Sequence, residues 1–378
     1  MAEGQKPYRL YRGGRRKGTV PLRSTPREPA SPGAPRARRR RRWWRWALVA
    51  LVSLVLLAIV WGALGFLSFS RGVAKANERL PASARAALAD RGRSILSEPT
   101  TILVIGTDGG RAAGRQDAAR SDSLLLLRTD PKRGRLSYLS IPRDLRVEIP
   151  GYGTEKINAA SQLGGPALAI ETVRALTGIP IDHVVVVDFD GFRELIDALG
   201  GVEIDVPKPI LSNRFDCPYP PARCREWEGW RFAKGRQHMD GRRALVYSRV
   251  RTNRLDPSDT DISRTARQQA VAEAVGDELT SVGTFLRLPF IGDSLAAPLA
   301  TDLSAAELIR LGWLRVRARS ESTLHCRLGG DPTTIGGESV LIGSEDNAAV
   351  ISMFLRASAP QPPPKGALYA PGCTRRPR

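Results

Sequence analysis

Residues 101–108 read Thr-Ile-Leu-Val-Ile-Gly-Thr-Asp, a short apolar run that ends in a glycine and then an acidic residue. An apolar run of this length, bounded by turn residues, predicts a buried strand. Two similar runs follow at Ser123–Arg128 and Leu136–Ile141, and the turn sequence Asp130-Pro-Lys-Arg-Gly134 separates them. This part of the chain therefore predicts three successive strands of one sheet.

Helical patterns alternate with further apolar runs along the rest of the chain. Helices are predicted at 166–176, 192–199, 240–247 and 264–279, and strands at 183–189 and 202–206, with glycines ending several of them. More elements between 284 and 358 complete a domain that spans 99–358. The alternation predicts an α/β fold, specifically an α/β/α sandwich with a mixed central sheet.

Three segments outside this pattern receive simpler interpretations. Residues 71–98 are polar and Ala-rich, which favours a helical stalk, and residues 207–235 are Pro-rich, which favours an irregular loop or lid. The Pro-rich residues 359–378 are expected to form a C-terminal tail.

Positive charge is concentrated at the N-terminus of the 378-residue chain. Of 58 basic and 38 acidic residues, which give a net charge of +20, 15 basic and two acidic ones lie in residues 1–46. Residues 1–45 are also rich in Pro and Gly, a composition that predicts a disordered tail. The folded part is therefore only mildly basic.

A 25-residue stretch without charge, residues 46–70, lies between Arg45 and Arg71. A membrane span needs about 20 apolar residues, so the stretch predicts a single transmembrane helix. The preceding tryptophans and the arginines at 38–42 suit the membrane interface and the cytoplasmic side, which places the N-terminus inside and the remainder outside. Ala74-Lys75-Ala76 resembles a signal-peptidase site, but the apolar stretch is longer than a usual secretory core. Because the arginine run borders a membrane segment, no nucleic-acid partner is expected.

All four cysteines follow the apolar stretch, where oxidation is expected. Cys217 with Cys224 and Cys326 with Cys373 is one of three possible pairings, and the sequence leaves the choice open. The three histidines are scattered, so no zinc site is predicted.

Charged residues gather at the ends of the predicted strands. Asp108 follows the first strand and Arg143 follows the third. Arg120 precedes the second strand, and Asp122 begins it. Ligands of open α/β sheets bind beyond the carboxyl ends of strands, and Asp122 joins this edge only if the second strand is antiparallel to the first. Two carboxylates without His or Cys suit Mg²⁺, with Mn²⁺ as the alternative.

A second group of polar residues lies further along the chain at Arg249, Arg251, Asp261, Arg264 and Gln268. The spacing of the last three places them on one helical face. Guanidinium groups bind phosphate oxygens in a bidentate manner, so the arginines predict a phosphate or pyrophosphate ligand. Taken singly, each of these residues also fits a turn, a cap, a solvated face or a surface ion pair.

The order of these motifs resembles the LytR-CpsA-Psr family of bacterial cell-envelope proteins. The resemblance runs from about Thr101 to Leu279, and the motifs that carry it are Ile105-Gly106-Thr107-Asp108, Arg120-Ser121-Asp122, Ser140-Ile141-Pro142-Arg143-Asp144, Lys156-Ile157-Asn158-Ala159-Ala160, Asp197-Ala198-Leu199-Gly200-Gly201-Val202, Arg249-Val250-Arg251, and Asp261 with Arg264, Arg267, Gln268 and Gln269. The chain departs from the family pattern after Asp108, where Gly109 and Gly110 precede Arg111.

The resemblance implies a cell-wall phosphotransferase that moves a glycopolymer from a polyprenyl-pyrophosphate carrier to a peptidoglycan hydroxyl. It implies that Asp108 and Asp122 hold Mg²⁺ and that Asp261, as base, and Arg143 are catalytic. The pyrophosphate would contact Arg120, Arg143, Arg249, Arg251, Arg264 and Gln268. Two alternatives remain: a hydrolase that releases the lipid-linked glycan with water, and a non-catalytic regulator that binds it.

Overall fold

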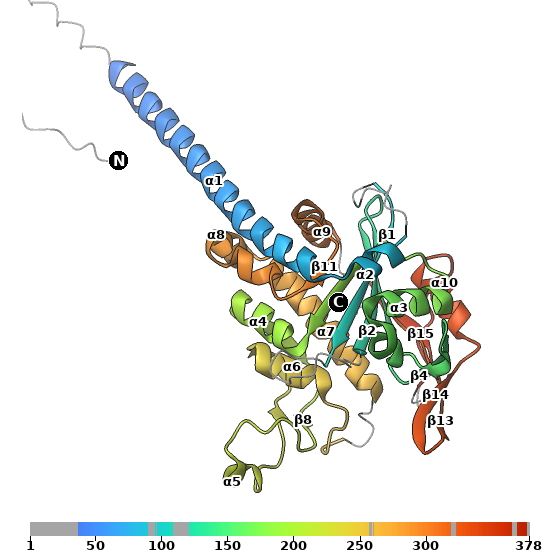
Figure 1. Cartoon of the computed structure of the whole chain (residues 1–378). Helices are drawn as coiled ribbons and strands as arrows, with labels where there is room; N and C mark the ends of the chain where they lie inside the picture. The colour runs from blue at the N-terminus through green and yellow to red at the C-terminus, as the bar shows by residue number, and fades with distance from the viewer. Residues whose placement is uncertain are drawn as a thin grey trace, which may run out of the picture. The chain divides into compact units, whose positions relative to one another are not determined.

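A seven-stranded mixed sheet forms the centre of the fold (Figure 1). The computed structural model describes residues 37–89, 95, 97–108, 121–256, 259, 261–318, 323–364 and 369–375, with backbone only at 37–42, Asp122, Asp261 and Ile262. The strands lie in the order β11 (Ala300–Thr301), β6 (His183–Asp188), β1 (Thr100–Thr107), β2 (Ser121–Asp130), β3 (Arg135–Ile141), β12 (Leu324–Arg327) and β15 (Gly372–Arg375). The β1 strand is parallel to β6 and antiparallel to β2, so the predicted mixed sheet is confirmed.

Alternating side chains of the three predicted strands enter two different cores. Leu103 and Leu126 join the core beneath α3 (Ala159–Thr177) and α10 (Asn347–Phe354). Their neighbours Val104 and Leu125 point to the opposite face, where Ala272 of α7 (Asp261–Leu279) packs. A strand buried on both faces reads as a continuous apolar run, which is why these segments lack polar alternation. Helices therefore cover both faces of the sheet, as predicted (Figure 1).

A third core holds the helices that carry the predicted arginines. It joins α4 (Phe189–Leu199), α6 (Gly241–Arg249), α7 and α8 (Val282–Ala296) to a two-stranded sheet of β7 (Val202–Val206) and β10 (Gly235–Met239). Asp188 and Asp240 cap the first turns of α4 and α6 by accepting hydrogen bonds from backbone N–H groups. These bonds satisfy backbone N–H groups that would otherwise lack partners and so stabilise the start of each helix.

Several elements differ from the sequence-based expectation. Strands were expected between 284 and 358, but the separate sheet of β13 (Gly330–Ile335), β14 (Glu338–Gly343), β4 (Leu145–Ile149) and β5 (Gly153–Lys156) was not predicted. Its strands β5 and β13 are mostly exposed and carry almost no apolar residues, so they do not stand out from loops, whereas β4 alternates buried apolar and polar residues. Residues 207–235 are largely irregular as expected, with only β8 (Ile210–Leu211), α5 (Pro221–Cys224) and β9 (Arg231–Phe232).

The proposed stalk is helical over 71–79 and 82–87, as expected, but it and residues 372–375 of the proposed tail are packed parts of the fold. Residues 71–98 include the end of α1 (Ala37–Arg79) and α2 (Ala82–Ala87), whose Ala76 and Ala84 are fully buried. Alanine is only weakly apolar, so it contributes little to an apolar pattern. A segment that buries alanines therefore looks polar in the sequence. At the other end, β15 adds an edge strand to the central sheet, where Cys373 is buried.

The α1 helix is long and apolar enough over Trp43–Arg79 to cross a membrane. The chain divides into two units, residues 1–56 and 57–378, and the second contains all the described sheets. The large apolar side chains of α1 before residue 60 are exposed. Exposed apolar surface of this extent requires a cover other than water.

Both disulfides join the cysteine pairs considered above, Cys217 with Cys224 and Cys326 with Cys373. The first closes a loop of seven residues on the surface. The second spans 47 residues and links β12 to β15 in the core. The second bond therefore adds a covalent link to the backbone pairing that holds β15 in the sheet.

Removing the Cys326–Cys373 bond should destabilise the fold more than removing Cys217–Cys224. Loop-closure entropy gives about 4 kcal/mol for the long loop and about 2.5 kcal/mol for the short one. Denaturant unfolding of the Cys326→Ala/Cys373→Ala and Cys217→Ala/Cys224→Ala chains measures both losses. Equal losses, or a larger loss for the short loop, would contradict the structural role assigned to β15.

Candidate functional site

Three strand ends meet at one edge of the central sheet. The antiparallel pairing of β1 with β2 places Gly106 opposite Ser123 and Thr107 opposite Ser121. Asp122 is therefore the extra residue of a bulge, directly across from the end of β1. The antiparallel arrangement on which its position depends is present, so Asp108 and Asp122 lie at the same edge.

The third strand brings Arg143 to this edge as well. Ile141, the last residue of β3, pairs with Leu124 near the start of β2. The Arg143 guanidinium is largely buried, and its Nε lies 3.5 Å from Asp144 Oδ2. Arg143 therefore projects from the strand ends with a fixed, partly neutralised charge.

The two acidic positions supply oxygen ligands of the kind that Mg²⁺ prefers. Asp108 is exposed, and only the backbone of Asp122 is described. The described residues contain no cluster of three or more His, Cys, Asp or Glu side chains suited to a metal. A magnesium ion here would need phosphate oxygens and water as its other ligands, which is its usual manner of binding in phosphate sites.

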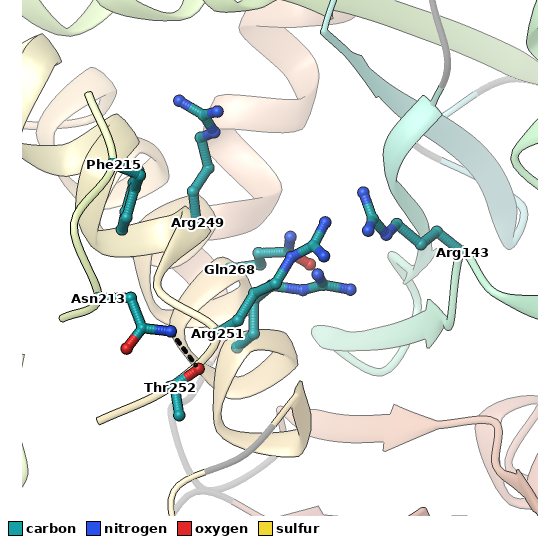
Figure 2. Close-up of a pocket in the computed structure, with 8 residues that line it drawn as sticks. Arg143, Asn213, Phe215, Arg249, Arg251, Thr252 and Gln268 are labelled. Atoms are coloured by element: carbon teal, nitrogen blue, oxygen red, sulfur yellow. Dashed lines mark hydrogen bonds between the residues drawn. The ribbon is translucent and has the colours of Figure 1, made fainter. Parts of the chain in front are cut away.

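A cavity of about 300 Å³ collects most of the predicted phosphate ligands (Figure 2). Eight residues line it: Arg143, Asn213, Phe215, Arg249, Arg251, Thr252, Arg264 and Gln268. In Figure 2 the side chains of Arg143 and Arg251 point toward one another across the cavity. Residues that follow β3, lie at and just after the end of α6, and belong to α7 thus converge on one space, although they are far apart in sequence.

Two α7 residues join the cavity to the strand edge. Arg264 is only 7% exposed, and Gln268 lies one turn further along the helix. Ser123, next to the β2 bulge, donates a hydrogen bond of 3.4 Å to Gln268 Oε1. The candidate base Asp261 begins the same helix, and its side chain is outside the described set. Arg120 also lies outside the described residues.

Arg249 differs from the other arginines of the cavity. Its guanidinium is hydrogen-bonded to Asp216 and lies 4.4 Å from the Phe189 ring and 5.6 Å from the Phe215 ring. Figure 2 shows it pointing away from Arg143. A cation held by a carboxylate and two aromatic rings is less able to add a phosphate contact, so Arg249 sits at the rim with much of its charge already compensated.

Three lining residues were not found from the sequence. Asn213 and Phe215 come from the irregular segment between β8 and α5, and Asn213 Nδ2 donates a 3.0 Å hydrogen bond to Thr252 Oγ1. This bond connects the irregular segment to the loop after α6. No periodic pattern marks such residues, because only the tertiary fold brings them to the cavity.

A buried ion pair supports the loop that carries Arg251. Arg267 Nη1 lies 2.9 Å from Asp259 Oδ1, and Arg267 Nη2 donates to the Val250 carbonyl at 2.5 Å. Both charged side chains are almost fully buried. Burial raises the pKa of the Asp259 carboxyl, but hydrogen bonds from Ser263, Arg267 and Asn253 outweigh this, so the net pKa is lowered.

Gln269 holds α7 against the central sheet. Its amide nitrogen donates to Ser140 Oγ at 2.7 Å and to the Cys326 carbonyl at 3.1 Å, which ties α7 to β3 and β12. Within the motif around Arg264 to Gln269, Arg264 and Gln268 therefore face the cavity, whereas Arg267 and Gln269 hold the helix in place.

Comparison with known proteins supports the same grouping of motifs. The profile of the LytR_cpsA_psr family matches residues 69–356. The TagU protein of Halalkalibacterium halodurans, a polyisoprenyl-teichoic acid–peptidoglycan teichoic acid transferase, is 32% identical over 69% of this chain and 79% of its own length. Bacillus subtilis TagV, named as a transferase of the same kind, is 34% identical over 57% of this chain.

The chain spans 52% of the length of B. subtilis TagV, about half of that relative. Among solved structures, TagT bound to LI-WTA is 26% identical, with a TM-score of 0.54 over 71% of this chain and 92% of that one. Residues 69–356, which the family profile matches, contain the sheet edge and the arginine cavity.

Replacing Asp259 by Asn should destabilise the chain strongly at neutral pH. The change leaves Arg267 buried without its counter-charge, which costs about 3–5 kcal/mol, whereas Asp130→Asn at the surface Arg133 pair should cost about 1 kcal/mol or less. Because the pKa of Asp259 is lowered by folding, its stabilisation is present above the unfolded pKa and lost as the pH falls through the folded value.

Denaturant unfolding between pH 7 and pH 2 measures both effects. The difference in unfolding free energy between the native chain and Asp259→Asn should shrink at acid pH, and Asp130→Asn should show little such change. A constant difference across the range would contradict the assigned ion pair.

Proposed function

Because the chain belongs to the LytR-CpsA-Psr family, we propose that it is a phosphotransferase of cell-wall assembly. Its donor is a glycopolymer on a polyprenyl-pyrophosphate carrier, and its acceptor is a hydroxyl of peptidoglycan. The related TagU and TagV proteins are named for transfer from a polyisoprenyl carrier to peptidoglycan. The polymer moved by this chain belongs to the same chemical class, a glycan linked through phosphate.

One observation carries the proposal: Arg143, Arg251 and Arg264 converge on a single cavity beside the strand edge that ends in two acidic residues. Three cations around so small a space need an anion to offset their mutual repulsion. A pyrophosphate provides several negatively charged oxygens at the spacing that guanidinium forks bind. The acidic edge alongside suits a divalent cation that shares the same oxygens.

The transfer step follows from this arrangement. The acceptor hydroxyl oxygen attacks the phosphorus that bears the glycan, a new P–O bond forms, and the bond to the bridging oxygen breaks. Polyprenyl phosphate leaves with the electron pair, and Asp261 accepts the hydroxyl proton. Arg143, Arg251, Arg264 and the Gln268 amide donate hydrogen bonds to oxygens whose charge changes during transfer, which is how such sites lower the barrier.

Asp108 and Asp122 would hold Mg²⁺, which would offset the negative charge of the pyrophosphate. Arg249 belongs to the rim of the site, where Asp216 and two phenylalanine rings hold it. Arg120 completes the set of phosphate contacts in this proposal. Asn213 and Thr252 border the cavity on the side of the irregular segment and would meet the glycan or the acceptor first.

The proposed location follows from α1. The helix spans the cell membrane once, the basic N-terminal tail remains in the cytoplasm, and the catalytic domain lies outside. The two disulfides fit an oxidising extracellular environment. Anchoring keeps the domain beside a donor that remains in the membrane through its polyprenyl tail.

Conservative replacement of the converging arginines should reduce transfer sharply. Arg143→Lys and Arg251→Lys each retain charge but lose the bidentate fork, so a loss of about 10- to 100-fold is expected from 1.5–3 kcal/mol per charge-assisted contact. The assay is mass spectrometry of the product from full-length protein in detergent, a polyprenyl-pyrophosphate-linked glycan, peptidoglycan fragments and Mg²⁺.

Arg133→Lys, in the turn at the far end of β2, is the matched control and should retain activity. Glycan joined to peptidoglycan through phosphate identifies the transferase. Free glycan phosphate that forms regardless of acceptor identifies a hydrolase instead. Binding of the donor without any product would leave only a non-catalytic regulator.

Removal of divalent cations should also stop the reaction. EDTA is expected to abolish transfer by the native protein, and added Mg²⁺ or Mn²⁺ should restore it. Asp108→Asn should raise the Mg²⁺ concentration needed for half-maximal activity, because it removes one negatively charged ligand. Full activity of the native protein in EDTA would refute the metal assignment while leaving the arginine site intact.

A further inference from the structure

One face of α8 carries large apolar side chains that the fold leaves uncovered. Val282 and Phe290 are each 75% exposed, and Phe285 and Leu286 are each 57% exposed. Their spacing places them on one side of the helix, so they form a continuous stripe. A soluble surface rarely displays two phenylalanines and two aliphatic residues together.

The α8 helix is packed closely against the C-terminal half of α1 (Figure 1). A Cβ atom at Gly72 would lie 2.3 Å from the Asp293 carbonyl oxygen, and one at Gly292 would lie 2.7 Å from Phe69 N. Lys75 Nζ also lies 2.6 Å from Asp293 Oδ2. Contacts this close leave no room for sliding, so α8 has a fixed position along α1.

These contacts fix where the exposed α8 side chains lie along the apolar run of α1, and so how deep they lie in a membrane that this run spans. The Trp61 and Phe290 rings are in contact, with centroids 5.6 Å apart. Trp61 precedes Ser70, the last residue of the uncharged run, by nine residues, or about 14 Å of α-helix. A hydrocarbon core is about 30 Å thick. When residues 46–70 span the membrane, Phe290 therefore lies below the headgroups, among the acyl chains.

The polar groups of α8 are arranged in agreement with this depth. Arg287 is the only charged residue between Val282 and Gly292. Its Nη2 donates a 2.6 Å hydrogen bond to the Leu199 carbonyl at the end of α4, so its charge is directed to the protein side. The ion pair of Lys75 with Asp293 lies at the C-terminal end of α8, nearer the end of the α1 run.

We propose that the exposed stripe of α8 is embedded in the outer leaflet of the membrane beside α1, where lipid acyl chains cover it. The inference rests on the proposed membrane anchorage and not on the transferase activity. The domain is then held to the bilayer at two places, the spanning helix and the α8 stripe. Two attachments fix the orientation of the arginine cavity to the membrane, which a single flexible helix does not.

The test uses single cysteines labelled with an environment-sensitive fluorophore. All four native cysteines are in disulfides, so a new cysteine is the only free thiol. Full-length Leu286→Cys and Phe290→Cys proteins are reconstituted into phosphatidylglycerol–phosphatidylethanolamine vesicles with nitroxide groups on the acyl chains. Leu57→Cys on α1 is the positive control, and Leu255→Cys, 55% exposed on a loop beside the arginine cavity, is the negative control.

The expected result is that the nitroxide lipids quench the fluorophore at positions 286 and 290 about as strongly as at position 57. They should not quench it at position 255. Quenching at 57 without quenching at 286 and 290 would overturn the proposal. If these two positions are then shielded from aqueous quencher, a second copy of the chain covers the stripe instead. Absence of quenching at 57 would overturn the anchorage and the stripe together. No outcome depends on turnover, so failure of the transferase proposal is detected separately.

Discussion

The antiparallel pairing of β1 with β2 determines where the candidate site residues lie. Asp108 follows the end of β1, and Asp122 lies at the start of β2. If β2 ran parallel to β1, the two residues would lie at opposite ends of the strands. The observed register brings both to one edge, with Asp122 in a bulge opposite the end of β1. The continued pairing of β2 with β3 adds Arg143 to the same edge. The pairing of β1, β2 and β3 thus brings three segments that are separate in sequence to one edge of the sheet.

The arginine cavity depends in turn on how its like charges are supported. Asp144 lies beside Arg143, and Asp216 is hydrogen-bonded to Arg249, so carboxylates compensate two of the guanidinium groups. Beneath the cavity, the buried pair of Asp259 with Arg267 fixes the loop that presents Arg251. A pre-arranged set of donors needs little reorganisation when charge develops, which is the main source of catalytic power in phosphoryl transfer. The support costs stability, since buried ion pairs seldom repay their desolvation.

Sequence reasoning was most successful where the signal is local. The apolar runs at 101–105, 123–128 and 136–141 predicted β1, β2 and β3 because strands buried on both faces leave a plain pattern. The start predicted at Pro166 corresponds to a kink in α3 at Gly164 and Gly165, where Gly165 has a φ of 64°. The second sheet was missed because its two short hairpins are joined only by the long-range pairing of β14 with β4, and β15 was missed because it depends on pairing with the distant β12. Arg143, Arg251 and Arg264 were found through motif order, whereas Asn213 and Phe215 reach the cavity only through tertiary structure.

The most direct test of the central claim is a structure of the full-length protein bound to a polyprenyl pyrophosphate in the presence of Mn²⁺, with the metal located by anomalous scattering. The account predicts the pyrophosphate between Arg143, Arg251 and Arg264, with Mn²⁺ on its oxygens and on Asp108 and Asp122. Pyrophosphate bound elsewhere on the chain, with the arginine cavity empty, would contradict it.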